Sequence, residues 1–125
     1  MLMMDSVVLY VQDVQVSQDF YTQILGCDSK ALSATCVEII FANDTRVLLK
    51  QSKSVVPESQ VTGGGSELSI LVADQITFQA LYQSWKTQSV EFAQQPAELP
   101  FGMSFVAQDP DEHRIRVTLL NKIAA

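Results

Sequence analysis

The sequence predicts an α+β protein built from two similar modules in one chain. Two observations carry this prediction. An apolar strand-like run closed by an Asp occurs at residues 7–13 and again at residues 68–74. Both runs are followed by a helix-like segment and then by extended segments. Repetition with a period of about half the chain indicates a duplicated module. Each copy is therefore expected to contain a strand, a helix and then two or three strands.

The first copy begins with a β-branched and aromatic strand at residues 6–12. The helix that follows is expected to start at Ser17, because a serine hydroxyl can cap the first free N–H groups of a helix. Gly26 suits the left-handed position that ends many helices. Two further strands, joined by a hairpin turn, are expected at residues 35–41 and 46–51.

The second copy repeats this order. Its helix is expected at residues 75–88, with Ile76, Leu81 and Trp85 at helical spacing on the buried face. Trp85 is interpreted as a core residue of this helix. The expected strands of the second copy are residues 67–73, 90–93, 103–108 and 113–120.

The length of 125 residues fits a single domain, covering residues 1–125. Within it, the two modules are expected at residues 5–52 and 66–121. Residues 53–65 are polar and contain one proline and three consecutive glycines, which is typical of a linker. A phosphate-binding loop would need a following helix, whereas a strand follows this segment.

The charge balance excludes several classes of partner. The net charge is −6 and the eight basic residues are scattered, so neither nucleic acid nor an anionic membrane is an expected partner. The sequence begins without a signal-peptide pattern and has no apolar run near the roughly 20 residues of a membrane span. A cytoplasmic location is therefore expected, with Cys27 and Cys36 as free thiols.

Two segments resemble the vicinal oxygen chelate superfamily, which includes glyoxalase I, extradiol dioxygenases and bleomycin-binding proteins. LYVQDVQVSQDFYTQILG resembles its opening motif, and FGMSFVAQDPDEHRIRV resembles its closing motif. The resemblance implies two βαβββ modules that form a curled mixed sheet around a pocket, in a homodimer. Glu112 and Ser89 stand where this family usually has glycine in the closing turn and at the end of the second helix.

Metal-dependent members of this family carry His or Glu ligands at three strand positions. By the resemblance, these positions are occupied here by Ser6, Glu67 and Arg116. A serine hydroxyl is a poor ligand for a divalent transition metal, and a permanent cation repels one. No metal and no cofactor are therefore expected. Glu67 and Arg116 are expected to pair, and His113 is interpreted as a turn residue.

The closing motif most resembles a metal-free subgroup that includes phenazine-antibiotic resistance proteins, which bind a planar antibiotic. Strand alternation and the closing segment add aromatic and apolar residues to the three former ligand positions. The expected ligand-binding residues are Ser6, Val8, Tyr10, Glu67, Ser69, Phe101, Met103, Phe105 and Arg116.

Three functions remain open at this point. The first is a metal-free protein that binds a planar aromatic or antibiotic-like small molecule in an apolar pocket, with no catalytic residue. The second is a glyoxalase-like lyase or isomerase with Glu67 as general base. The third is a dimeric scaffold whose pocket has collapsed. The absence of a complete ligand set favours the first.

Overall fold

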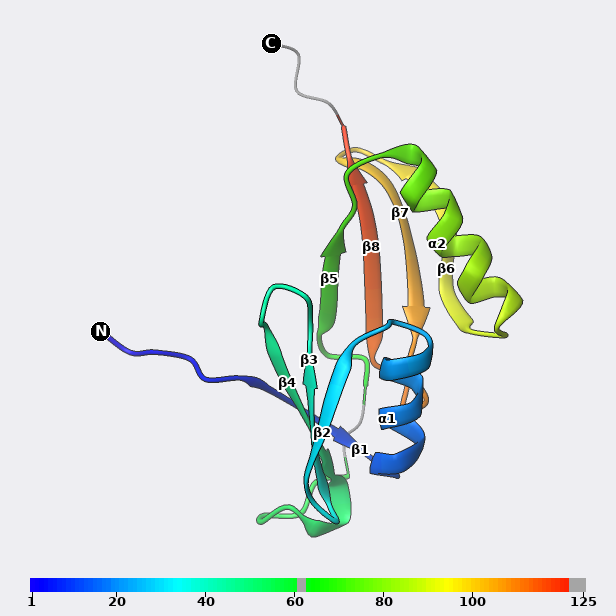
Figure 1. Ribbon diagram of the computed structural model, residues 1–125. Coiled ribbons are helices and arrows are strands. Elements are labelled where there is room, and N and C mark those ends of the chain that lie inside the picture. Colours follow the sequence, from blue (N-terminus) through cyan, green and yellow to red (C-terminus); the bar gives the residue numbers. More distant parts are fainter. Residues whose placement is uncertain (61–62, 122–125) are drawn as a thin grey trace. The chain divides into compact units, whose positions relative to one another are not determined.

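The computed structural model describes residues 1–60 and 63–121 (Figure 1). The chain divides into two compact units, Met1–Gly63 and Gly64–Ala125. Each unit has the order strand, helix and three strands, and each forms its own four-stranded mixed sheet. The predicted α+β class with two βαβββ modules is therefore confirmed. Within the described ranges, no helix has the length and apolar character needed to cross a membrane.

The first unit has the strand order β1-β4-β3-β2. Strand β1 runs parallel to β4, and the other neighbours are antiparallel. Helix α1 contacts β2, β3 and β4. The elements are β1 (Val7–Val11), α1 (Val14–Gln23), β2 (Asp28–Ser33), β3 (Cys36–Ile40), β4 (Arg46–Gln51) and the short 3-10 helix η1 (Ser52–Ser54).

The second unit repeats this arrangement with the strand order β5-β8-β7-β6. Strand β5 runs parallel to β8, as β1 does to β4, and helix α2 contacts β8. The elements are β5 (Glu67–Leu71), α2 (Gln75–Thr87), β6 (Glu91–Leu99), β7 (Gly102–Gln108) and β8 (Arg114–Leu120).

Helix α1 begins one turn earlier than the sequence predicted. Its N-cap is Asp13, whose carboxylate accepts hydrogen bonds from the backbone N–H groups of Gln15 and Val16. The predicted cap, Ser17, is fully buried inside the helix. A carboxylate at the N-cap satisfies two free N–H groups and carries a charge that the helix dipole favours. The Asp that closes the first strand therefore also opens the helix.

Helix α2 begins in the same way at Asp74, whose carboxylate accepts a hydrogen bond from Thr77 N at 2.7 Å. This bond lowers the pKa of Asp74. The buried face of the helix consists of Phe78, Tyr82 and Trp85. The core assignment of Trp85 is thus confirmed, whereas Ile76 is 82% exposed and was wrongly included. Ile76 lies in the first turn, rotated away from the sheet.

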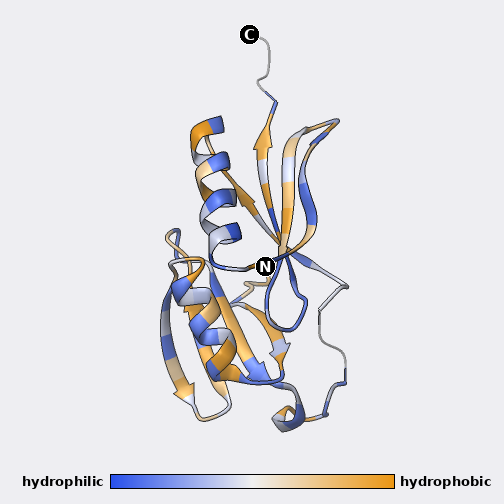
Figure 2. Cartoon of the chain, turned by 90° about the vertical axis from the view of Figure 1, so that its right-hand side faces the viewer, coloured by the Kyte–Doolittle hydropathy of each residue, from blue (hydrophilic) through white to orange (hydrophobic). Residues whose placement is uncertain are grey.

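Much of the apolar sequence lies within the strands, and both helices carry a mixture of apolar and polar residues (Figure 2). The second unit has an aromatic core centred on Phe105, which is fully buried. Its ring centroid lies 5.2 Å from Phe78, 5.6 Å from Trp85 and 5.8 Å from Phe92. The core of the first unit is mostly aliphatic and consists of Leu9, Val11, Tyr21, Val37, Ile39, Val47 and Leu49.

Several turn positions have a left-handed backbone, and at Gly26 this was predicted. Gly26 has a φ of 71° after helix α1. Ser89 and Glu112 have φ values of 62° and 67°. A left-handed conformation costs a non-glycine residue roughly 1 kcal/mol. The closing turn offsets this cost through Asp109, whose carboxylate accepts hydrogen bonds from the N–H groups of Asp111 and His113.

Candidate functional site

Arg116 is the best-anchored polar side chain on the face of the second sheet that α2 does not cover. Its Nε donates to Glu67 Oε1 at 2.8 Å, and its Nη1 donates to Ser104 Oγ at 2.9 Å and to Gln94 Oε1 at 3.3 Å. The predicted pairing of Glu67 with Arg116 is therefore confirmed. Nη2 has no hydrogen-bond partner within the described part of the chain. The guanidinium is thus fixed on one side and has a donor left for another molecule.

The sheet register explains why these residues meet. Ser69 on β5 is the partner of Arg116 on β8, and Arg116 is in turn the partner of Val106 on β7. Glu67 shares a face with Ser69 because strand residues two apart point the same way. The Glu67 side chain is 37% exposed and that of Arg116 is 21% exposed. The ion pair is therefore at the surface of the sheet, accessible to solvent.

The structure does not bring the three closing-segment residues together with Arg116. Phe105 is fully buried among the aromatic rings under α2. Met103 lies on the same face of β7 by strand alternation, opposite to the face that carries Ser104. Phe101 lies in the turn before β7 and is 45% exposed. Phe105 is therefore a core residue and not a ligand contact, because helix α2 covers the face of the sheet on which it lies.

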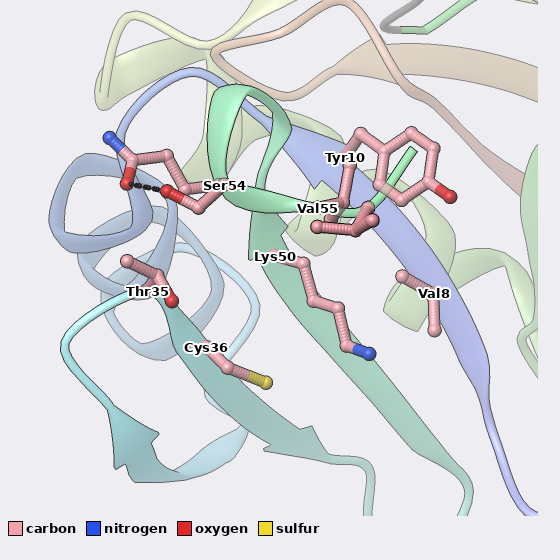
Figure 3. Close-up of a pocket in the computed structure, with 9 residues that line it drawn as sticks. Val8, Tyr10, Thr35, Cys36, Lys50, Ser54 and Val55 are labelled. Atoms are coloured by element: carbon pink, nitrogen blue, oxygen red, sulfur yellow. Dashed lines mark hydrogen bonds between the residues drawn. The ribbon is translucent and has the colours of Figure 1, made fainter. Parts of the chain in front are cut away.

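The first unit contains a pocket of about 460 Å³ on the face of its sheet that α1 does not cover (Figure 3). Val8 and Tyr10 line it, and each is partly exposed. Ser6 precedes β1, is half-buried and does not line the pocket. The other lining residues were not predicted and are Thr35, Cys36, Lys50, Gln51, Ser54, Val55 and Val56.

A signal for part of this pocket was present in the sequence. Tyr10 pairs with Lys50, and Lys50 pairs with Cys36, so the three residues form one row across β1, β4 and β3. Correct strand registers alone would have found this row. Ser54, Val55 and Val56 were missed for another reason, because they follow β4 in a segment interpreted as linker.

A second ion pair lies in the same sheet. Arg46 on β4 pairs with Glu38 on β3, and its Nη1 also donates to Asp5 at 2.6 Å. The hydrogen bond to Glu38 is the largest of the effects that raise the pKa of Arg46. Glu38 is therefore engaged by Arg46 and does not neutralise Lys50.

The single histidine has a structural role. His113 is 5% exposed, and its Nδ1 lies 2.8 Å from Asp109 Oδ2. The same carboxylate holds the backbone of the closing turn. His113 therefore lies between the closing turn and β8 and is held by the carboxylate that orders this turn.

Comparisons with known proteins agree with this geometry. The family model of the Glyoxalase/Bleomycin resistance protein/Dioxygenase superfamily matches residues 3–117. The chain belongs to this superfamily. No curated protein matches the chain at a significant level.

Solved structures give the same result for the fold. A protein from Agrobacterium tumefaciens, solved by solution NMR, is 36% identical with a TM-score of 0.86, over 98% of this chain and 100% of that one. A superfamily protein from Alicyclobacillus acidocaldarius is 17% identical with a TM-score of 0.75, over 96% and 92% of the two chains. A lactoylglutathione lyase from Agrobacterium tumefaciens is 13% identical with a TM-score of 0.72, over 94% and 92%.

The side chains at the positions that the family resemblance assigns to metal ligands do not fit a divalent metal. Arg116 lies 2.8 Å from Glu67 and gives that carboxylate a protein cation as its partner. Ser6 supplies a neutral hydroxyl, which is a weak ligand. Within residues 1–60 and 63–121, no three His, Cys, Asp or Glu side chains are close enough together to hold a metal ion. These side chains therefore do not support a metal-assisted step.

Proposed function

We propose that this superfamily member is a metal-free protein that binds a planar aromatic, antibiotic-like small molecule. One observation carries the proposal. At a position where metal-dependent relatives have a ligand, Arg116 is held by Glu67, Ser104 and Gln94 and keeps one unengaged donor group. A fixed guanidinium is well suited to a carboxylate or carbonyl oxygen of a ligand.

In this proposal, Arg116 and Ser69 contact the polar edge of a ligand, and Glu67 fixes the guanidinium. Phe101 is the exposed aromatic residue of the closing segment and is a candidate contact for the rings, whereas Met103 lies on the opposite face of β7 from Arg116 and is left out. The first unit offers a surface of its own, separate from the site at Arg116: Val8 and Tyr10 are partly exposed and are suited to an aromatic ligand, and Ser6 is a candidate polar contact. We further propose that the protein works in the cytoplasm as a homodimer, the arrangement that the superfamily resemblance implies.

The lyase or isomerase alternative would use Glu67 as a general base. Arg116 Nε donates to Glu67 Oε1, which engages one oxygen of that carboxylate in holding the guanidinium. This contact favours a positioning role for Glu67 over proton abstraction from a substrate.

The test compares phenazine-1-carboxylate with uncharged phenazine by isothermal titration calorimetry. Arg116→Leu is expected to weaken binding of the carboxylate about tenfold, the effect of one charge-assisted hydrogen bond. Binding of phenazine itself should change less than about twofold. Lys86→Leu is the control, because Lys86 is exposed on helix α2, on the opposite face of the sheet from Arg116, and its loss removes the same charge.

Two outcomes would overturn the proposal. One is that neither compound binds the parent protein at concentrations up to about 1 mM, which corresponds to roughly 4 kcal/mol of binding free energy. The other is that Arg116→Leu and Lys86→Leu weaken binding of the carboxylate equally, because the effect would then be one of net charge alone.

A further inference from the structure

The pocket of the first unit has a chemical character that the site at Arg116 does not explain. One part of its wall is apolar and contains Val8, Tyr10, Val55 and Val56. The remainder carries hydroxyl, thiol and amide groups and one cation, Lys50. An apolar wall with a few polar groups is typical of pockets that bind small organic molecules, and the volume of about 460 Å³ lies in their usual range.

Among the described residues that line this pocket, Lys50 is the only charged one. No acidic side chain in the described part of the chain forms an ion pair with it. Glu38, the acidic residue on the neighbouring strand, is engaged by Arg46. In a protein of net charge −6, an unneutralised ammonium group in a pocket is a local attraction for an anion.

The duplicated module supports a specific role for this row of residues. Tyr10, Lys50 and Cys36 pair across three strands of the first sheet. The equivalent row of the second sheet is Leu71, Thr118 and Ser104. The aromatic ring, the cation and the thiol thus all occur in the first copy and are replaced in the second.

We propose that the pocket of the first unit binds an aromatic organic anion, with Lys50 contacting the anionic group and Tyr10 and Val8 contacting the rings. The inference rests on the proposed binding function and adds to it a second anchoring cation, independent of Arg116. The side chains of Lys50 and Cys36 extend in the same direction from neighbouring strands (Figure 3). A ligand held by Lys50 would therefore cover the Cys36 thiol.

The first experiment uses two fluorescent probes with the same ring system. 1-Anilinonaphthalene-8-sulfonate carries a sulfonate, and N-phenyl-1-naphthylamine lacks it. Lys50→Met is expected to weaken binding of the sulfonate probe about tenfold and binding of the neutral probe less than about twofold. Lys53→Met is the matched control, because the substitution removes the same charge. Lys53 is exposed on η1 and does not line the pocket.

The second readout locates the bound probe. The sulfonate should slow alkylation of Cys36 by N-ethylmaleimide at least about fivefold, since a bound ligand blocks access to the thiol. The effect is read on the Cys36 peptide by mass spectrometry. Cys27 is the internal reference, because burial and the nearby Asp28 raise the pKa of its thiol to about 11 and keep it slow to react.

The variants separate this inference from the proposed function. Loss of sulfonate binding in Lys50→Met, with Cys36 protection in the parent and in Arg116→Leu, supports the pocket. Loss in Arg116→Leu alone, with Cys36 unprotected, overturns the pocket and leaves the function at Arg116 standing. If Lys50→Met and Lys53→Met weaken binding of the sulfonate probe equally, the pocket proposal is also overturned.

Discussion

Replacing Arg116 by leucine should destabilise the second unit, and the structure indicates which partner accounts for most of the loss. Three partners lose a charged donor, and the longest of the three hydrogen bonds, to Gln94 at 3.3 Å, is expected to contribute least. Glu67 is 37% exposed, so its ion pair with Arg116 is worth about 1 kcal/mol or less. Ser104 is fully buried, and its hydroxyl would lose the donor that lies 2.9 Å away. A buried hydroxyl without a partner costs about 1–3 kcal/mol.

The sum predicts a loss of about 1–4 kcal/mol in the free energy of unfolding. Adding Ser104→Ala should recover about 1–2 kcal/mol, because the unsatisfied hydroxyl is removed. Adding Glu67→Gln instead should recover less than about 1 kcal/mol. The assay is urea unfolding followed by the fluorescence of Trp85, the one tryptophan of the chain, which is buried in the same unit.

Two double-mutant cycles, one pairing Arg116→Leu with Ser104→Ala and one pairing it with Glu67→Gln, give the two coupling energies directly. The reasoning is refuted if Glu67→Gln recovers more stability than Ser104→Ala. It is also refuted if the Arg116→Leu single variant unfolds at the urea concentration of the parent.

Three further predictions follow from particular contacts. Gly102→Ala should unfold at a markedly lower urea concentration than the parent, because the added Cβ would lie 2.1 Å from Leu119 O at a φ of 145°; an unchanged midpoint would contradict this close approach of β7 and β8. Asp74 has a lowered pKa in the folded state, so its stabilising effect is present above its usual value of 3.8 and is lost as the pH falls through the lower folded value. Unfolding of Asp74→Asn should therefore depend less steeply on pH between about 4 and 2 than unfolding of the parent, and identical profiles would count against this. Light scattering should report about twice 13.8 kDa for the proposed homodimer, and a mass of one chain at micromolar concentration would argue against it.

Much of the fold was predictable because the relevant signals are local. The repeated strand closed by an Asp marks the start of both modules, and that Asp caps the following helix in both. Strand β2 was missed because its sequence, DSKALS, lacks apolar alternation, which agrees with the exposure of most of its residues in the structure. Strand β6 was predicted too short because it contains Pro96. A proline is tolerated there, since β6 is an edge strand with irregular register on both sides of Gln94.

The candidate site was only partly predictable, for reasons of packing. The Glu67–Arg116 pair followed from the resemblance to the family. The burial of Phe105 did not, because strand alternation gives two faces without saying which one the helix covers. Lys50 and Cys36 escaped notice because their importance depends on the register of three strands. Ser54 and Val55 line the pocket from a segment whose composition is that of a linker.

The central claim is that this protein binds its ligand without a metal. The most direct measurement is calorimetric titration of phenazine-1-carboxylate into protein before and after dialysis against EDTA, with the metal content of both samples determined by elemental analysis. We predict the same affinity in both titrations and less than about one tenth of a metal ion per chain, since Ser6 and Arg116 complete no ligand set. Binding that is lost on chelation and restored by adding nickel, zinc, iron or manganese would contradict it.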